Sequence, residues 1–253
     1  MIHETKILRI SNLDRTKSSK SESDFTVHLQ NRVQNVKSVV FKSLTVPNTQ
    51  YNITSHNRHL LINWDGIGPT LITLQTKQYS LSELIAELES VINPTPGTGT
   101  FSITQDPDTD KLIFTSTGTA FSIAGYREGN PIAKVLGLGL WIDPTPVLTY
   151  SAPFLPDLRG LQTAYIISQA LAGSYSLIDS ADAKVSHVIG QVSMANTPYR
   201  STAYYHSEAV ENHDFEFPSH KDLSSIDIKL VDKLGNLLEL NGIEVTITLE
   251  LTY

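Results

Sequence analysis

Histidines are the most numerous candidates for metal chemistry in this chain. His56 and His59 form an H-x-x-H pair, and His206, His213 and His220 recur at intervals of seven residues. A pair without a third ligand nearby is a weak indication of zinc binding, and a seven-residue interval on β structure does not bring three rings to one point. We therefore expect solvent-exposed histidines and no metal site.

An acidic run is the second candidate for metal binding. Asp106, Asp108 and Asp110 form a D-x-D-x-D pattern, which opens many calcium-binding loops. The sixth position of such a loop needs glycine and the twelfth needs glutamate, whereas this chain has Lys111 and Thr117 there. The run lies between two apolar segments, so it predicts a turn between strands. No cofactor is expected.

Motifs of well-known enzyme classes are missing from the sequence. It has no cysteine, no P-loop, no G-x-S-x-G elbow and no H-E-x-x-H helix, which predicts a protein that is not an enzyme. An enzyme of the cupin or glycosidase kind stays open as an alternative, because paired carboxylates meet in space rather than in sequence. A carbohydrate-binding β-sandwich is the other alternative, and its ring-stacking side chains would come from Trp141, Tyr199, Tyr204 and Tyr205.

The charge of the chain is unevenly distributed. The net charge is −7, but residues 1–60 hold 9 Lys+Arg against 4 Asp+Glu, and the remaining residues hold 10 against 22. A nucleic-acid-binding module would present a basic face, so we expect no specific nucleic-acid site. The longest mostly apolar stretch, residues 131–142, is too short for a membrane span of about 20 residues.

Alternating apolar residues predict β structure along most of the chain. Phe25, Val27 and Leu29 share one face of a strand, and the run at residues 36–46 is more apolar, as in a strand inside a sandwich. Further β runs are predicted at residues 5–10, 59–64, 71–76, 101–104, 111–115, 121–124, 163–168, 187–194, 201–207, 225–231, 237–240 and 244–253.

One short helix is predicted at about residues 81–92, where Ser80 and Glu83 have the spacing of a capping box. Many short strands without alternating helices indicate an all-β antiparallel β-sandwich, and a single jelly roll is the fold we expect. The predicted organisation is a flexible or extended N-terminal arm at residues 1–24, followed by a single jelly-roll domain at residues 25–253.

Five short motifs occur in order along the chain. They are D-F-T-V at residues 24–27 leading to P-N-T-Q-Y-N-I at 47–53, Y-S-L-S-E-L-I at 79–85, a strand–turn–strand at 101–114, D-L-R-G at 157–160, and a closing hairpin with the last strand at 228–249. This order resembles the penton (vertex) capsid proteins of virophages, polinton-like viruses and related large double-stranded DNA viruses. Those proteins are single jelly rolls. Some carry an extra inserted domain, which is not expected here, so no vertex-decorating role is assigned.

The resemblance implies a structural virion protein that forms the five-fold vertices of an icosahedral capsid as a homopentamer. It also implies partners, namely further copies of the chain, the neighbouring major capsid protein and minor capsid proteins under the shell, and assembly inside the infected host cell. Candidate assembly contacts are the basic residues of the N-terminal arm, Arg9, Arg15, Lys17 and Lys20. They would suit an arm that reaches an anionic or acidic neighbour.

Overall fold

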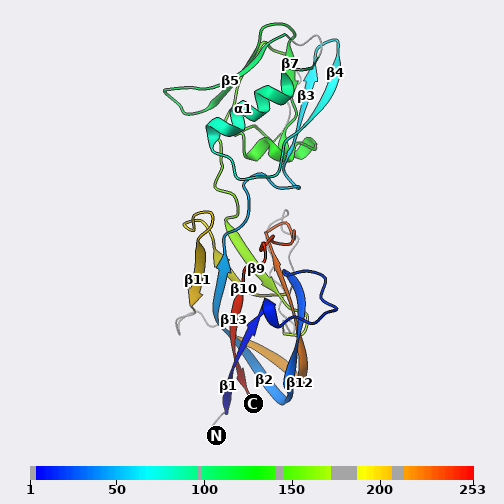
Figure 1. Ribbon diagram of the computed structural model, residues 1–253, viewed down its shortest axis with the longest axis vertical. Helices are drawn as coiled ribbons and strands as arrows, with labels where there is room; N and C mark the ends of the chain where they lie inside the picture. The colour runs from blue at the N-terminus through cyan, green and yellow to red at the C-terminus, as the bar shows by residue number, and fades with distance from the viewer. Residues whose placement is uncertain (1–3, 96–98, 141–144, 172–186, 207–213) are drawn as a thin grey trace. The chain divides into compact units, whose positions relative to one another are not determined.

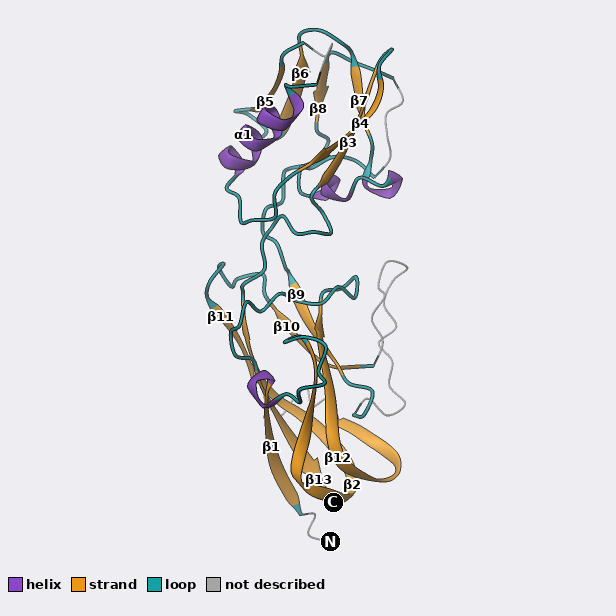
Figure 2. Ribbon diagram, turned by 45° about the vertical axis from the view of Figure 1, so that its right-hand side comes forward, coloured by secondary structure: helices purple, strands orange, loops and turns teal. Residues whose placement is uncertain are grey.

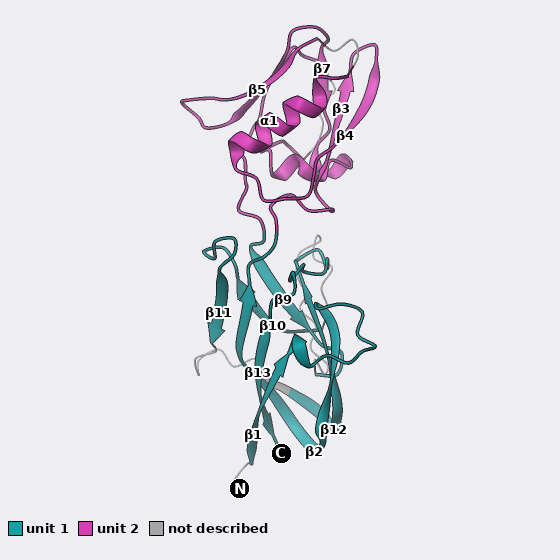
Figure 3. Ribbon diagram, in the orientation of Figure 1, with its two compact units in different colours: residues 1–50, 161–253 teal, residues 51–160 magenta. Residues whose placement is uncertain are grey.

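The chain forms two compact units in a computed structural model (Figure 3). Unit 1 comprises residues 1–50 and 161–253, and unit 2 comprises residues 51–160. The residues that the structure describes are 4–95, 99–140, 145–171, 187–206 and 214–253. The prediction of a single domain over residues 25–253 is therefore wrong, because unit 2 is inserted into unit 1 and each unit buries a hydrophobic core of its own.

Unit 1 is built on one curled antiparallel sheet of seven strands. They are β1 (Thr5–Ser11), β2 (Asp24–Pro47), β9 (Thr163–Ile167), β10 (Val188–Ser193), β11 (Thr202–His206), β12 (Asp214–Val231) and β13 (Thr246–Thr252), with a 3-10 turn η1 (Asn12–Asp14) after β1. The long strand β2 takes part in both layers of the sandwich. Its first half pairs with β12, which is followed by β9 and β10. Its second half lies between β13 and β11, and β1 completes that layer (Figure 1).

The core of unit 1 lies between these two layers. Phe41 of β2 is buried and stacks on Tyr205 of β11, with 5.6 Å between the ring centroids. Gly190 of β10 lies against the same ring from the opposite layer, and a Cβ atom added there would come within 2.8 Å of the Phe41 ring. The close approach of the two layers at this point therefore requires glycine.

Strand β2 is longer than predicted. We expected two strands, at residues 25–29 and 36–46, and the structure has one strand that also includes the polar residues between them. These residues pair with β12 through shifted register, and Asn35 has a φ of 58°. They contain neither proline nor glycine, so nothing stops the strand there, and the irregular register lets the ribbon bend.

The N-terminal segment is an integral part of unit 1 from residue 4 onward, so the prediction of a flexible arm at residues 1–24 is wrong there. Strand β1 pairs with β13 along its whole length. The Asn12 side chain is buried, accepts a hydrogen bond from the Val245 N–H (3.0 Å) and donates one to the Ile243 carbonyl (3.2 Å). The Thr16 N–H donates to the Thr26 carbonyl (2.8 Å). Ordering this segment costs conformational entropy, and its few apolar residues bury too little surface to offset that cost. The hydrogen bonds offset it instead.

Unit 2 contains two three-stranded antiparallel sheets and one α-helix (Figure 2). Its elements are β3 (His59–Trp64), β4 (Gly68–Thr73), α1 (Leu81–Ile92), β5 (Phe101–Gln105), β6 (Leu112–Ser116), β7 (Phe121–Ile123), the 3-10 turns η2 (Tyr126–Glu128) and η3 (Pro131–Lys134), and β8 (Thr149–Ser151). The rings of Trp64, Phe101 and Phe121 pack together in its core, with centroids 5.2 to 5.7 Å apart.

The predicted helix is confirmed with its capping box. The Ser80 hydroxyl accepts from the Glu83 N–H (3.3 Å), and the Glu83 carboxylate accepts from the Ser80 N–H (2.8 Å), a bond that lowers the pKa of Glu83. Side chains from the end of α1 cover the edge of β5. Asn93 accepts from the Phe101 N–H and Glu89 accepts from the Ile103 N–H, both at 2.7 Å. This strand edge is therefore closed within the unit.

The architecture confirms the predicted fold class, which is an all-β antiparallel jelly-roll β-sandwich with one short helix. The helix belongs to the inserted unit and not to the sandwich itself. Within the described ranges, no helix has the length and apolar character needed to cross a membrane.

Candidate assembly surface

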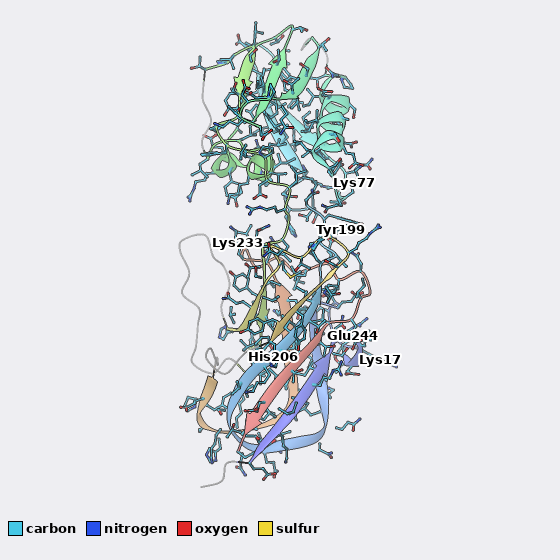
Figure 4. All side chains as sticks on the ribbon, turned by 90° about the vertical axis from the view of Figure 1, so that its left-hand side faces the viewer. Lys17, Lys77, Tyr199, His206, Lys233 and Glu244 are labelled. Carbon is cyan, nitrogen blue, oxygen red and sulfur yellow. The ribbon has the colours of Figure 1, made fainter. Side chains whose placement is uncertain are left out.

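The four basic residues predicted as assembly contacts lie in unit 1, on β1 and on the loop that connects it to β2. Arg9 is exposed on β1, and its side chain has no hydrogen-bond or ion-pair partner among the described residues. Lys17 is also exposed and unpaired within the same ranges (Figure 4). Arg15 donates from Nη1 to the Asn12 carbonyl (2.9 Å), and Lys20 Nζ lies 3.8 Å from an Asp24 carboxylate oxygen.

The loop that carries these residues is held by hydrogen bonds to neighbouring elements of unit 1. Ser23 is buried, and its hydroxyl donates to the Leu238 carbonyl. Its own carbonyl accepts from the Leu230 N–H (2.8 Å). The Glu22 carboxylate accepts from the Gly242 N–H (2.8 Å). The loop therefore displays Lys17 and Lys20 from an ordered backbone, and its basic side chains stay exposed.

The outer face of the layer β1-β13-β2-β11 is polar. One row across it consists of Arg9, Thr248, Ser43 and His206, which are neighbours on successive strands. The adjacent row, which includes Ile10, Ile247 and Leu44, is buried and faces the core. On the outer face Lys42 Nζ lies 3.4 Å from a carboxylate oxygen of Glu250. Because successive side chains of a strand point to opposite faces, the layer has one face toward the core and one polar face. The polar face carries Arg9 at one edge and His206 at the other.

The metal candidates do not converge in the described parts of the chain, where no group of three His, Asp or Glu side chains could hold an ion. His59 lies on β3, and its Nδ1 is 3.1 Å from the Thr73 hydroxyl. The acidic run is the predicted turn. The Asp106 carboxylate accepts from the Asp108 N–H (2.9 Å) and the Thr109 N–H (3.3 Å), which lowers its pKa. Asp110 has a φ of 57°, the left-handed conformation that glycine often supplies. His213 lies outside the described residues.

The aromatic residues predicted for sugar stacking do not form one platform in the described structure. Tyr204 is 67% exposed on the outer face of β11, whereas Tyr205 points the other way and packs on Phe41. Tyr199 lies before β11, beside the guanidinium of Arg200. Trp141 lies outside the described residues. Neighbouring side chains on a strand point to opposite faces, so Tyr204 and Tyr205 cannot stack on one ligand.

A buried asparagine connects three of the sequence motifs. The Asn52 side chain, 2% exposed, accepts from the Tyr79 N–H (2.9 Å) and donates to the Tyr79 carbonyl (2.8 Å). It also donates to the Leu158 carbonyl (3.3 Å). The motifs at residues 47–53, 79–85 and 157–160 therefore meet where the chain enters and leaves unit 2. The three sequence motifs contain these residues, but nothing in the sequence indicates that they are in contact.

Comparison with known proteins gives a likeness in fold alone. A crystal structure of the selenomethionine-labelled penton protein of mavirus matches with a TM-score of 0.52 and 9% sequence identity, over 98% of this chain and 99% of that chain. No protein-family model matches the sequence. No curated protein matches it either. The chain is thus similar in fold, over nearly its full length, to the mavirus penton protein.

Proposed function

We propose that the chain is a penton protein, a non-enzymatic capsid component that forms the five-fold vertices of an icosahedral virion as a homopentamer. The observation that carries this proposal is the fold likeness to the mavirus penton protein, which extends over nearly the whole of both chains. That extent includes both the jelly-roll unit and the inserted unit, so the two proteins share more than a common β-sandwich.

Two features of unit 1 support an assembly role. Its two hydrogen-bonded layers form a rigid unit, and identical copies of a rigid unit can pack around a closed cyclic axis through heterologous contacts. Its exposed Arg9 and Lys17 have no intramolecular partner among the described residues, so they are available to acidic groups of a neighbouring subunit. The neighbours we propose are further copies of the chain, the major capsid protein around the vertex and minor capsid proteins beneath it.

The inserted unit 2 gives the protein a second folded module. A separate core and a capped helix make it a unit that can present contacts of its own. We propose that it adds contacts of its own at the vertex, a role that the sequence prediction of a single domain had left unassigned.

Co-assembly with the major capsid protein of the same virus tests the vertex role. Particles assembled with the wild-type chain should show it at the five-fold positions in electron cryomicroscopy reconstructions. The triple variant R15E/K17E/K20E should reduce its occupancy at those positions, because three cations on the ordered loop become anions. Lys233→Glu, which reverses an exposed charge on another turn of unit 1, is the control. Vertices that close without the chain would contradict the proposal.

A further inference from the structure

Three strands of unit 1, namely β1, β10 and β11, have an edge with no strand beside it in the described part of the chain. β1 pairs only with β13, and β11 pairs only with β2. They are the two outer strands of one layer, β1-β13-β2-β11, as the ribbons in Figure 1 show. In unit 2, Glu89 and Asn93 cover the edge of β5, whereas β4, β7 and β8 each pair with one strand among the described residues. An open strand edge is a place where a further strand can add.

The hydrogen bonds of β1 show which of its backbone groups are free. The Tyr253 N–H donates to the Glu4 carbonyl (3.1 Å), and the Asn12 N–H donates to the Val245 carbonyl (3.3 Å). Bonded and non-bonded residues alternate along an antiparallel pair, so the even-numbered residues of β1 bond to β13. The backbone groups of the odd-numbered residues, Ile7 and Arg9 among them, point to the open edge.

The same alternation identifies the free groups of β11. The Asn48 N–H donates to the Ser201 carbonyl (2.8 Å), which indicates that Ala203 and Tyr205 bond to β2. The backbone groups of Tyr204 and His206 then point to the open edge. Both edges therefore offer N–H and carbonyl groups with the two-residue spacing that strand pairing needs.

Strand direction and register allow these two edges to meet between copies. Directions alternate across the four strands, so β11 of a second copy in the same orientation runs antiparallel to β1. If the second copy is related to the first by rotation about an axis parallel to the strands, residues of one row stay at the same height along that axis in both copies. Arg9 and His206 belong to one row, so Arg9 of one copy then lies opposite His206 of the next, and both present outward backbone groups.

The side chains at the two edges are chemically complementary. The Tyr204 and His206 rings are nearly parallel, 7° apart, with 6.4 Å between their centroids. The Arg9 guanidinium is exposed and has no partner among the described residues. Guanidinium groups stack on aromatic faces. A register shift of two residues places Arg9 opposite Tyr204 instead, so the cation meets this ring pair in either register.

We propose that copies of the chain join head to tail by pairing β1 of one copy with β11 of the next, with Arg9 against Tyr204 and His206. This inference rests on the proposed homopentamer and names the interface that builds it. Such a contact uses two different edges of each copy, so it is heterologous and closes into a ring when the rotation between copies allows it.

Arg9→Pro tests the backbone part of the interface, because Arg9 faces a residue of β11 in either register. Arg9 is exposed and its N–H points outward, so proline removes an edge donor without removing a bond to β13. Arg9→Ala, which removes the same guanidinium and keeps the N–H, is the matched control, and circular dichroism verifies that both variants keep the fold. Relative to this control, the concentration at which the assembly dissociates should rise about tenfold, as one lost hydrogen bond predicts.

A disulfide cross-link tests the register. The chain has no cysteine, so in a mixture of Arg9→Cys copies and His206→Cys copies the proposed interface brings one cysteine of each kind together. Within a copy these positions are three strand spacings apart, about 14 Å, which no disulfide spans. The interface predicts an intermolecular cross-link on oxidation. Arg9→Cys mixed with Tyr204→Cys reports the shifted register, and Lys233→Cys mixed with His206→Cys is the control.

The outcomes separate this inference from the function on which it rests. A wild-type pentamer that Arg9→Pro weakens more than Arg9→Ala does, with a cross-link in one of the two registers, supports the β1–β11 interface. A wild-type pentamer that Arg9→Pro weakens no more than Arg9→Ala does and that forms neither cross-link overturns the interface and leaves the penton proposal standing. A wild-type chain that forms no pentamer overturns both.

Discussion

Replacing Asn52 by alanine should unfold unit 2 preferentially. Its side chain satisfies the N–H and the carbonyl of Tyr79, and both hydrogen bonds are buried. Alanine leaves these two backbone groups without partners, and each buried unsatisfied group costs about 1–3 kcal/mol. We expect a loss of about 3 kcal/mol in the free energy of unfolding of unit 2, which corresponds to a change of roughly 150-fold in the opening equilibrium.

Hydrogen exchange measured by mass spectrometry on the intact chain resolves this effect by segment. Slow amides in residues 51–160 should exchange about 150-fold faster in the variant, whereas those of unit 1 should keep their wild-type rates, because each unit has its own core. Asn63→Ala, which truncates an exposed asparagine on β3, should change neither unit. Equal loss of protection in both units would refute the reasoning, since it would mean that they unfold as one.

Three further changes have defined consequences for stability. Gly190→Ala should cost unit 1 about 1–3 kcal/mol in calorimetry, because the added methyl group displaces a core ring; an unchanged melting temperature would contradict the packing described. Ser80→Ala should cost unit 2 about 1 kcal/mol in urea unfolding through loss of the helix cap, and a neutral result would show that the cap carries no stability. The Asp157 carboxylate, which accepts two bonds from the Arg159 guanidinium (2.9 and 2.8 Å), has a lowered pKa. The ionised Asp157 carboxylate stabilises unit 2 above the ordinary pKa of aspartate, and this stabilisation is lost as the pH falls through the lowered pKa. Arg159→Gln should therefore make the stability of unit 2 less sensitive to acid.

Local signals in the sequence predicted most individual elements. The helix was predicted because Ser80 and Glu83 form a capping box before an apolar stripe, and both features are local. The turn at Asp106 was predicted for the same reason, since its carboxylate bonds to the next residues in the chain. Alternating apolar residues likewise located β9 and β13, where one face of the strand is buried.

The inserted unit depends on contacts that are distant in sequence, so it was missed. The chain enters and leaves unit 2 without a linker rich in glycine or serine, and the strands of both units have the same apolar pattern. The Asn52 side chain connects the segments through which the chain enters and leaves unit 2. Its partners Tyr79 and Leu158 lie 27 and 106 residues away in the sequence. A single asparagine in a turn-like segment gives no indication of such partners.

The N-terminal segment was misjudged because its stability does not come from apolar burial. Residues 12–24 contain one large apolar side chain, Leu13, which is itself 59% exposed. The segment is ordered by hydrogen bonds of Asn12, Ser23 and Glu22 to residues near the C-terminus. The assembly candidates therefore lie on fixed positions of the fold, with Arg9 at the open edge of β1.

The mass of the purified protein in solution, measured by native mass spectrometry, tests the central claim most directly. One chain has a mass of 27.9 kDa. The account predicts a closed particle of five times that mass, because a ring of identical heterologous contacts leaves no interface unpaired. A monomer at every concentration, or a closed assembly of any other number of copies, would contradict it.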